Sequence, residues 1–111
     1  GLKPDYDSGW ISENATSAHV TPLTHNLWVI PARVQIWFSP DNSPTYVYPV
    51  WNFRHNTGAC AGSWDQPSVR WSTTQARLSR YEPGVLYAFY SQAEGGWSCW
   101  DSGFLRVMAW K

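Results

Sequence analysis

Charged residues are scarce in this 111-residue chain, at 14% of the sequence. Eight lysines and arginines balance eight aspartates and glutamates, so the formal net charge at pH 7 is zero. A protein that binds nucleic acid or an anionic membrane surface needs a basic patch, whereas the basic residues here are scattered singly along the chain. The composition therefore argues against nucleic acid as a partner.

Long apolar segments are also lacking. No apolar run approaches the roughly 20 residues that cross a bilayer as a helix. The chain does not open with the charged and apolar regions of a secretory signal peptide. We expect a soluble protein that does not insert into a membrane, and any targeting peptide has been removed or was never cloned.

Cysteine is limited to Cys60 and Cys99. Two cysteines cannot complete a four-ligand zinc site, and His19, His25 and His55 lack the spacing of metal ligands. We therefore expect no metal and no cofactor. The cysteines are either two free thiols, as in the cytosol, or one disulfide, which would stabilise the fold by about 4 kcal/mol. We expect the disulfide, and with it a secreted, extracellular or cell-surface location.

Period-two alternation recurs along the chain, while helical spacing is hard to find. Val34, Ile36 and Phe38 take one face of residues 32–39, as in a half-buried strand. Similar β-rich runs cover residues 45–51, 68–74, 75–81, 85–91 and 104–110. Pro49 removes a hydrogen-bond donor and predicts an edge strand or a bulge. The chain is thus expected to form one domain over residues 1–111, an all-β antiparallel sandwich of about six to eight short strands.

The triplet Asp-Ser-Gly occurs twice, at residues 7–9 and 101–103, each time before an aromatic and an aliphatic residue. Asp or Ser ahead of Gly favours a tight turn, because glycine tolerates positive φ. Each triplet is predicted to be a turn from which a strand starts. We favour convergent turn chemistry over an internal duplication.

Three segments together resemble the H-type lectin domain: "YDSGWI" (6–11), "THNLWVIPARVQIWFS" (24–39) and "WDSGFLRVMAW" (100–110). That family comprises small β-sandwiches of snail agglutinins and discoidin C-terminal regions. The resemblance implies a homotrimer that binds glycans, typically of the galactose type, at sites between or near protomers. The family's sugar-contacting Trp-His dipeptide is absent here, and residues 52–67 form a longer connection. The resemblance therefore implies the fold more strongly than the sugar, and a galactose preference should not be assumed.

Two Trp-Asp pairs suggest a binding site independently of any family. A sugar presents an apolar C–H face and a ring of hydroxyls, which an aromatic platform and polar acceptors can match. The segment "GGWSCWDSG" (95–103) is interpreted as a loop that the disulfide joins to the loop carrying the other pair. The predicted platforms are Trp64, Trp97 and Trp100, the predicted acceptors are Asp65 and Asp101, and further hydrogen bonds are expected from Arg54, His55 and Asn56.

Catalysis is not expected. A G-x-S-x-G nucleophile elbow is absent. The eight carboxylates fall in termini, turns or loops, and none lies in an apolar strand that would raise its pKa. The sequence therefore predicts a non-catalytic lectin that is multivalent through oligomerisation, in which Trp100→Ala should abolish glycan binding without affecting the fold. The alternative is a trimeric structural or adhesion tip module of a phage or cell-surface protein, with its aromatics buried between protomers and no sugar site.

Overall fold

The computed structural model describes most of the chain; for residues 54–56 and 63–65 it describes the backbone alone. The described ranges are 2–14, 19–43, 45–50, 54–56, 60, 63–80 and 85–111. Regular structure in these ranges consists of antiparallel strands and one 3₁₀ turn. The all-β prediction is therefore confirmed. The segments β1 to β12 outnumber the six to eight strands expected, and two of them, β1 and β5, are only two residues long.

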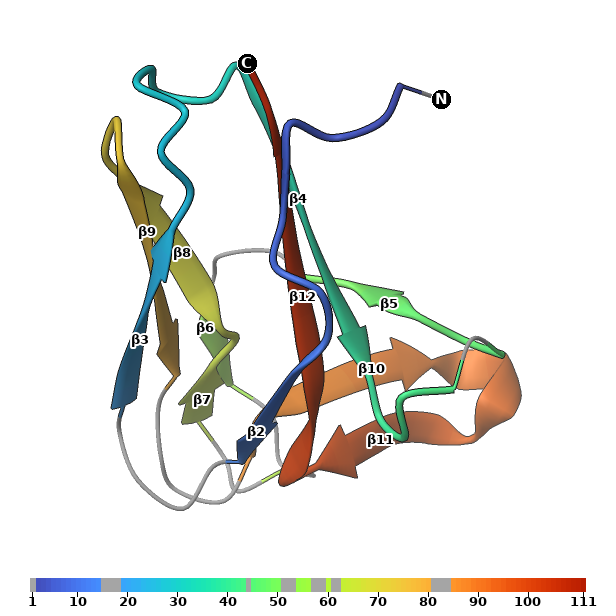
Figure 1. The fold of residues 1–111 in the computed structure, drawn as a ribbon. Coiled ribbons are helices and arrows are strands. Elements are labelled where there is room, and N and C mark those ends of the chain that lie inside the picture. The colour runs from blue at the N-terminus through green and yellow to red at the C-terminus, as the bar shows by residue number, and fades with distance from the viewer. Residues whose placement is uncertain are drawn as a thin grey trace.

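The larger sheet is five-stranded and is built around the long strand β12 (Ser102–Trp110). On one side β12 pairs with β1 (Tyr6–Asp7) and β2 (Ile11–Asn14), and on the other with β4 (Arg33–Ser39). Beyond β4 lies the short edge strand β5 (Tyr48–Pro49), as the proline predicted. Figure 1 shows β4 and β12 running side by side along the length of the molecule.

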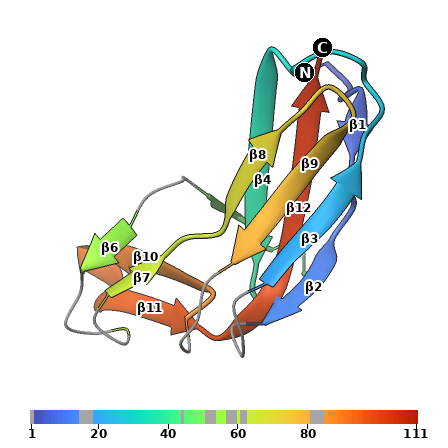
Figure 2. The ribbon, with the colours of Figure 1, turned by 90° about the vertical axis from the view of Figure 1, so that its left-hand side faces the viewer.

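The second sheet is three-stranded, in the order β3-β9-β8. Its strands are β3 (His19–Thr24), β9 (Gln75–Arg80) and β8 (Ser68–Trp71). Figure 2 shows this sheet in front of β12 and β4, so that the two sheets face each other. Buried Glu13 of the larger sheet accepts hydrogen bonds from Arg80 Nε and from Thr21 Oγ1, the latter at 3.1 Å, and so links the sheets.

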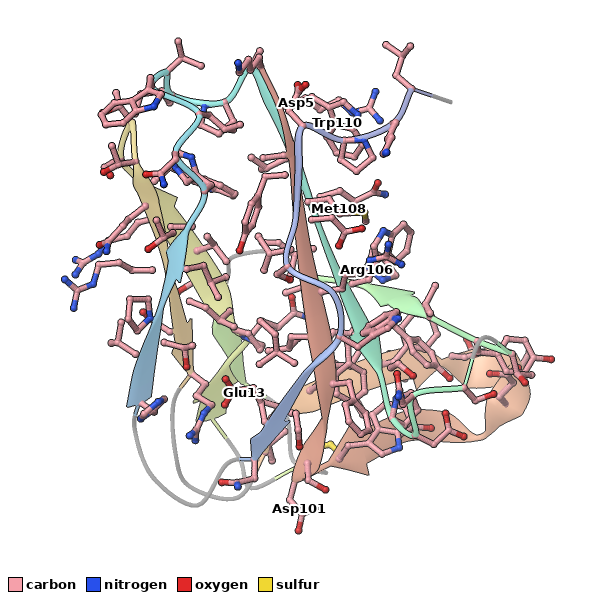
Figure 3. The ribbon with its side chains drawn as sticks, in the orientation of Figure 1. Asp5, Glu13, Asp101, Arg106, Met108 and Trp110 are labelled. Carbon is pink, nitrogen blue, oxygen red and sulfur yellow. A yellow bond between two sulfur atoms is a disulfide. The ribbon has the colours of Figure 1, made fainter. Side chains whose placement is uncertain are left out.

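The hydrophobic core lies between these sheets. Its fully buried members are Phe38 and Leu105 of the larger sheet, Leu78 of the second sheet, and Leu86 and Tyr87, which follow the second sheet along the chain. Along β12 the residues at 105, 107 and 109 are buried, while Arg106, Met108 and Trp110, each following one of them, are half-buried and lie along the strand (Figure 3). The predicted alternation of residues 104–110 is thus confirmed.

Two hairpins complete the fold. β10 (Tyr87–Ser91) and β11 (Gly96–Trp100) are joined by the 3₁₀ turn η1 (Gln92–Glu94) and lie across one end of the molecule (Figure 1). β6 (Arg54–Asn56) pairs with β7 (Ser63–Asp65). Buried Cys60, in the connection between β6 and β7, forms a disulfide with Cys99 of β11, with 6.0 Å between the Cα atoms. The predicted disulfide is confirmed.

Both chain termini lie at the end opposite the β10–β11 hairpin (Figure 1). The backbone N–H of Asp5 donates to the carbonyl of Ala109 at 2.9 Å. The indole Nε1–H of Trp110 donates to the carbonyl of Leu2 at 3.1 Å. These bonds hold the first residues of the described chain alongside its last strand.

The two Asp-Ser-Gly triplets differ in structure. Gly9 has a φ of 68°, and its N–H donates to the Asp7 carboxylate at 2.9 Å, so the first triplet is the predicted turn. Gly103 instead lies within β12, where an added Cβ would stand 2.5 Å from the Phe38 ring. The turn prediction is wrong for the second triplet, because close packing and not positive φ requires its glycine.

Candidate functional site

Five predicted sugar-binding residues lie on the β6–β7 hairpin. Its register pairs His55 with Trp64 and Arg54 with Asp65, while Asn56 pairs with Ser63. The backbone therefore brings these residues together in pairs, and the disulfide at Cys60 joins their hairpin to β11. Their side chains lie outside the described part of the structure, so their role in binding stays a prediction.

The predicted loop at residues 95–103 is wrong, because Gly96–Trp100 forms strand β11 and β12 begins at Ser102. The Trp100 ring packs at the margin of the core, with its centroid 5.5 Å from that of Phe38 and 5.3 Å from that of Tyr48. Asp101 follows at an exposed bend, at the far end of β12 from the chain termini (Figure 3). Trp100 thus supports other aromatic rings, and Asp101 lies at the surface.

Trp97 lies on the opposite face of the same hairpin. Residues three apart on a strand point to opposite sides, and Trp97 packs against the cluster that contains Cys60 and Ala88. Its ring centroid is 5.4 Å from that of Tyr90, the exposed residue opposite it in the register. Trp97 and Trp100 therefore cannot form one continuous platform.

A pocket of about 310 Å³ opens on the Trp100 side of this hairpin, where β5 and β10 meet. We call it the aromatic pocket; it is lined by Tyr46, Val47, Tyr48, Pro49, Phe89 and Glu94. Tyr48 and Phe89 are half-buried, with ring centroids 5.0 Å apart and planes inclined by 60°. The side chain of Tyr46 is 72% exposed. The pocket combines an ordered aromatic surface with a freely accessible tyrosine.

The core holds the aromatic surface in place. The Tyr48 ring contacts the rings of Phe38, Tyr87 and Trp100 as well as that of Phe89. The Tyr87 hydroxyl donates to the carbonyl of Pro49, and burial raises the pKa of Tyr87, which keeps this donor protonated. Tyr48 and Pro49 are therefore positioned before any ligand arrives.

Glu94 is the charged residue of the aromatic pocket, and the turn of the hairpin places it there. Gly95 and Gly96 have φ values of 98° and 104°, which favour glycine, and the Gly95 N–H donates to the Gln92 carbonyl at 3.3 Å. Within the described part of the chain, the exposed Glu94 carboxylate forms no hydrogen bond and no ion pair. It is an acceptor at the edge of an aromatic surface.

Sequence reasoning missed the aromatic pocket. The tyrosines at 46 and 48 were recognised only as part of a β-rich run, and Glu94 only as a loop carboxylate. Among the described residues there is no cluster of three or more side chains able to hold a metal ion, and no helix there is long and apolar enough to span a membrane. No protein-family model and no curated protein matches the chain.

Proposed function

We propose that this chain is a non-catalytic carbohydrate-binding protein that holds a sugar ring in the aromatic pocket. One observation supports the proposal above all: the packed rings of Tyr48 and Phe89 line the same pocket as the carboxylate of Glu94, which has no partner among the described residues. Aromatic faces cover the C–H side of a pyranose, while a carboxylate accepts from its hydroxyls. The volume is near the lower end for ligand pockets and suits a single sugar residue.

The residues that line the aromatic pocket make different contacts with the sugar. Tyr48 and Phe89 provide the floor, and Glu94 accepts hydrogen bonds from one or two hydroxyls at the rim. Tyr46, being exposed, packs on the outer side of the sugar at the cost of ordering its own ring. Few of these contacts are deeply buried, so one such site binds weakly.

Multivalency would offset weak single sites, and we propose a homotrimer, the assembly that the H-type lectin resemblance implies. Trp28, Val29 and Ile30 are consecutive exposed apolar residues, and the Trp28 side chain is 72% exposed. Such a patch on a small protein is typical of an interaction surface. Three sites on one particle gain on the order of 10² to 10⁴ in avidity. The disulfide supports a secreted or cell-surface setting, where glycans are presented.

The alternative is a trimeric structural or adhesion tip module without a sugar site. The exposed segment 28–30 favours it equally well, since it would serve as an interface in either case. The aromatic pocket favours the lectin, because a purely structural module has no use for an unpaired carboxylate beside an ordered aromatic floor.

Binding of the wild type to a glycan array, followed by titration of the best ligand, tests the proposal. Glu94→Gln removes the charged acceptor and should weaken binding roughly tenfold or more. Tyr46→Ala should also weaken it. Asp101→Asn and Tyr90→Ala are the matched controls, an exposed carboxylate and an exposed tyrosine outside the pocket, and should bind as the wild type does.

The controls also separate the two candidate sites. Loss of binding in Asp101→Asn with full binding in Glu94→Gln would return the site to the Trp-Asp pairs. An array on which the wild type binds no glycan would reject the lectin and favour the tip module.

A further inference from the structure

The arginines of this protein fall into two groups. Three of those with described side chains have partners: Arg80 pairs with Glu13, Arg106 with Asp7, and the guanidinium of Arg33 lies 4.3 Å from the centroid of the Trp110 ring. The other two, Arg70 and Arg77, are exposed and, within the described ranges, form no ion pair, hydrogen bond or ring contact. Within the described part of the chain, their cationic groups contribute no contact to the fold.

These two free arginines are direct neighbours. Arg70 of β8 is paired in register with Arg77 of β9. Both project from the outer face of the three-stranded sheet, because the flanking residues Ala76 and Leu78 are buried on its inner face. Like charges placed directly opposite each other on adjacent strands destabilise a sheet. The sheet thus carries a repulsive pair that no described residue compensates.

A pocket of about 270 Å³ lies between them, which we call the arginine pocket. It is lined by Arg70, Trp71, Ser72, Gln75 and Arg77. The side chains of Arg70, Gln75 and Arg77 can donate hydrogen bonds to a ligand through guanidinium or amide groups. The Ser72 hydroxyl already donates to the Gln75 carbonyl at 3.3 Å, and the Trp71 ring turns to the inner face, where it lies 5.6 Å from the ring of His25. None of the lining residues is acidic, so the pocket is suited to an anion.

The end of the arginine pocket is fixed by the turn between β8 and β9. Ser72 Oγ accepts the backbone N–H groups of Thr74 and Gln75 at 3.2 and 3.0 Å. Buried His25 bridges the turn to the neighbouring loop: its Nδ1 accepts from the N–H of Leu27 at 3.0 Å, so its Nε2–H donates to the Ser72 carbonyl at 2.9 Å. The arginines therefore project from a sheet and a turn whose backbone is already ordered.

We propose that the arginine pocket binds the sulfate or carboxylate group of an acidic polysaccharide. Two planar guanidinium groups can each donate two parallel hydrogen bonds to one oxyanion, and the bound charge removes their mutual repulsion. Gln75 then contacts the sugar that carries the anionic group. This proposal does not rest on the aromatic pocket, which shares no residue with it.

Direct binding measurements with defined polymers test the proposal. The probes are dextran sulfate and polygalacturonate, with neutral dextran as the uncharged polymer and inorganic sulfate as a competing free anion. We expect the wild type to bind at least one acidic polymer, and neutral dextran not at all. Arg70→Gln and Arg77→Gln should each weaken binding on the order of tenfold, the double variant more.

A matched double variant distinguishes a built pocket from general attraction between charges. Lys3→Gln with Lys111→Gln removes the same two charges from exposed positions near the termini and should change the affinity less than twofold. An equal loss in both double variants would overturn the proposal. So would an unchanged affinity in the arginine variants, or binding of inorganic sulfate without binding of either acidic polymer.

Melting temperatures distinguish a binding role of the two arginines from a purely structural one. Because the paired guanidiniums repel each other, Arg77→Gln should raise the melting temperature without ligand while it lowers the affinity. Dextran sulfate should raise the melting temperature of the wild type and not that of the double arginine variant. A lower melting temperature in Arg77→Gln would show that Arg77 stabilises the sheet, and would contradict the proposal.

Discussion

The aromatic pocket and the arginine pocket relate to the core in opposite ways. The floor of the first contains Tyr48, whose ring contacts rings of the core, so the same contacts stabilise the fold and shape the site. The second pairs Arg70 with Arg77 on the outer face of a sheet, where their charges oppose folding. Substitutions of the packed rings of the aromatic pocket should therefore lower both ligand affinity and stability. Substitutions of the two arginines should lower ligand affinity while they raise stability.

The largest effect should come from the disulfide. Replacing Cys60 and Cys99 together by serine opens a covalent loop with a sequence separation of 39 and should lower the free energy of unfolding by about 4 kcal/mol. Hydrogen exchange should show the loss of protection in β10 and β11 to exceed that in β8 and β9. A uniform loss over both regions would show that the disulfide supports the whole fold and not the aromatic end in particular.

Trp100→Ala should come next. Its ring packs against Phe38, Tyr48 and Tyr87, so its removal should lower the free energy of unfolding by about 3 kcal/mol in chemical denaturation. Sugar binding should weaken as well, because Tyr48 loses a neighbour, while binding of acidic polymers should not change. The exposed Tyr46→Ala is the stability control, with an expected change in the free energy of unfolding within about 0.5 kcal/mol. Full stability in Trp100→Ala would restore the interpretation of Trp100 as a ligand platform alone.

The smallest effect concerns an arginine that does have a partner. The side-chain hydrogen bond from Arg106 lowers the pKa of Asp7 below its ordinary value. The carboxylate thus stabilises the fold above its unfolded pKa, near 3.9, and this contribution is lost as the pH falls through the lower folded value. Both side chains are about one-third exposed, so the contribution should stay below about 1 kcal/mol.

Asp7→Asn should accordingly lower the melting temperature slightly at pH 7 and not at pH 2, opposite in sign to the change expected for Arg77→Gln at pH 7. A deficit of equal size at both pH values would mean that the hydrogen bonds of Asp7, and not its charge, stabilise the turn.

The strands were predictable where one face meets the core. Residues 104–110 alternate because Leu105, Val107 and Ala109 face inward while their neighbours are half-buried. Residues 33–39 form the predicted strand, but their burial does not alternate: Val34 is exposed, and Phe38 and Ser39 are both buried. The β10–β11 hairpin has packed residues on both faces, Trp100 on one and Trp97 on the other, which conceals the period-two pattern. Together with two turn glycines, this made a strand resemble a loop.

The aromatic pocket could not be predicted because its residues, at 46–49 and at 89 and 94, are brought together only by the tertiary fold. The arginine pocket could have been predicted in part from the sequence. A hairpin around the turn at 72–74 fixes the register that pairs Arg70 with Arg77, and both flanking strands were predicted. Assigning the turn would have revealed the opposed charges, which the even overall balance of the composition conceals.

The position of the chain ends matters for attaching the protein to a surface or a label. Both ends lie at one pole of the molecule and the β10–β11 hairpin lies at the other (Figure 1). A bead, dye or fusion partner attached through either end would leave the hairpin facing the medium. Sensor surfaces coupled through the first or the last residue should therefore display the aromatic pocket equally well, and the choice of tag position need not compromise glycan capture.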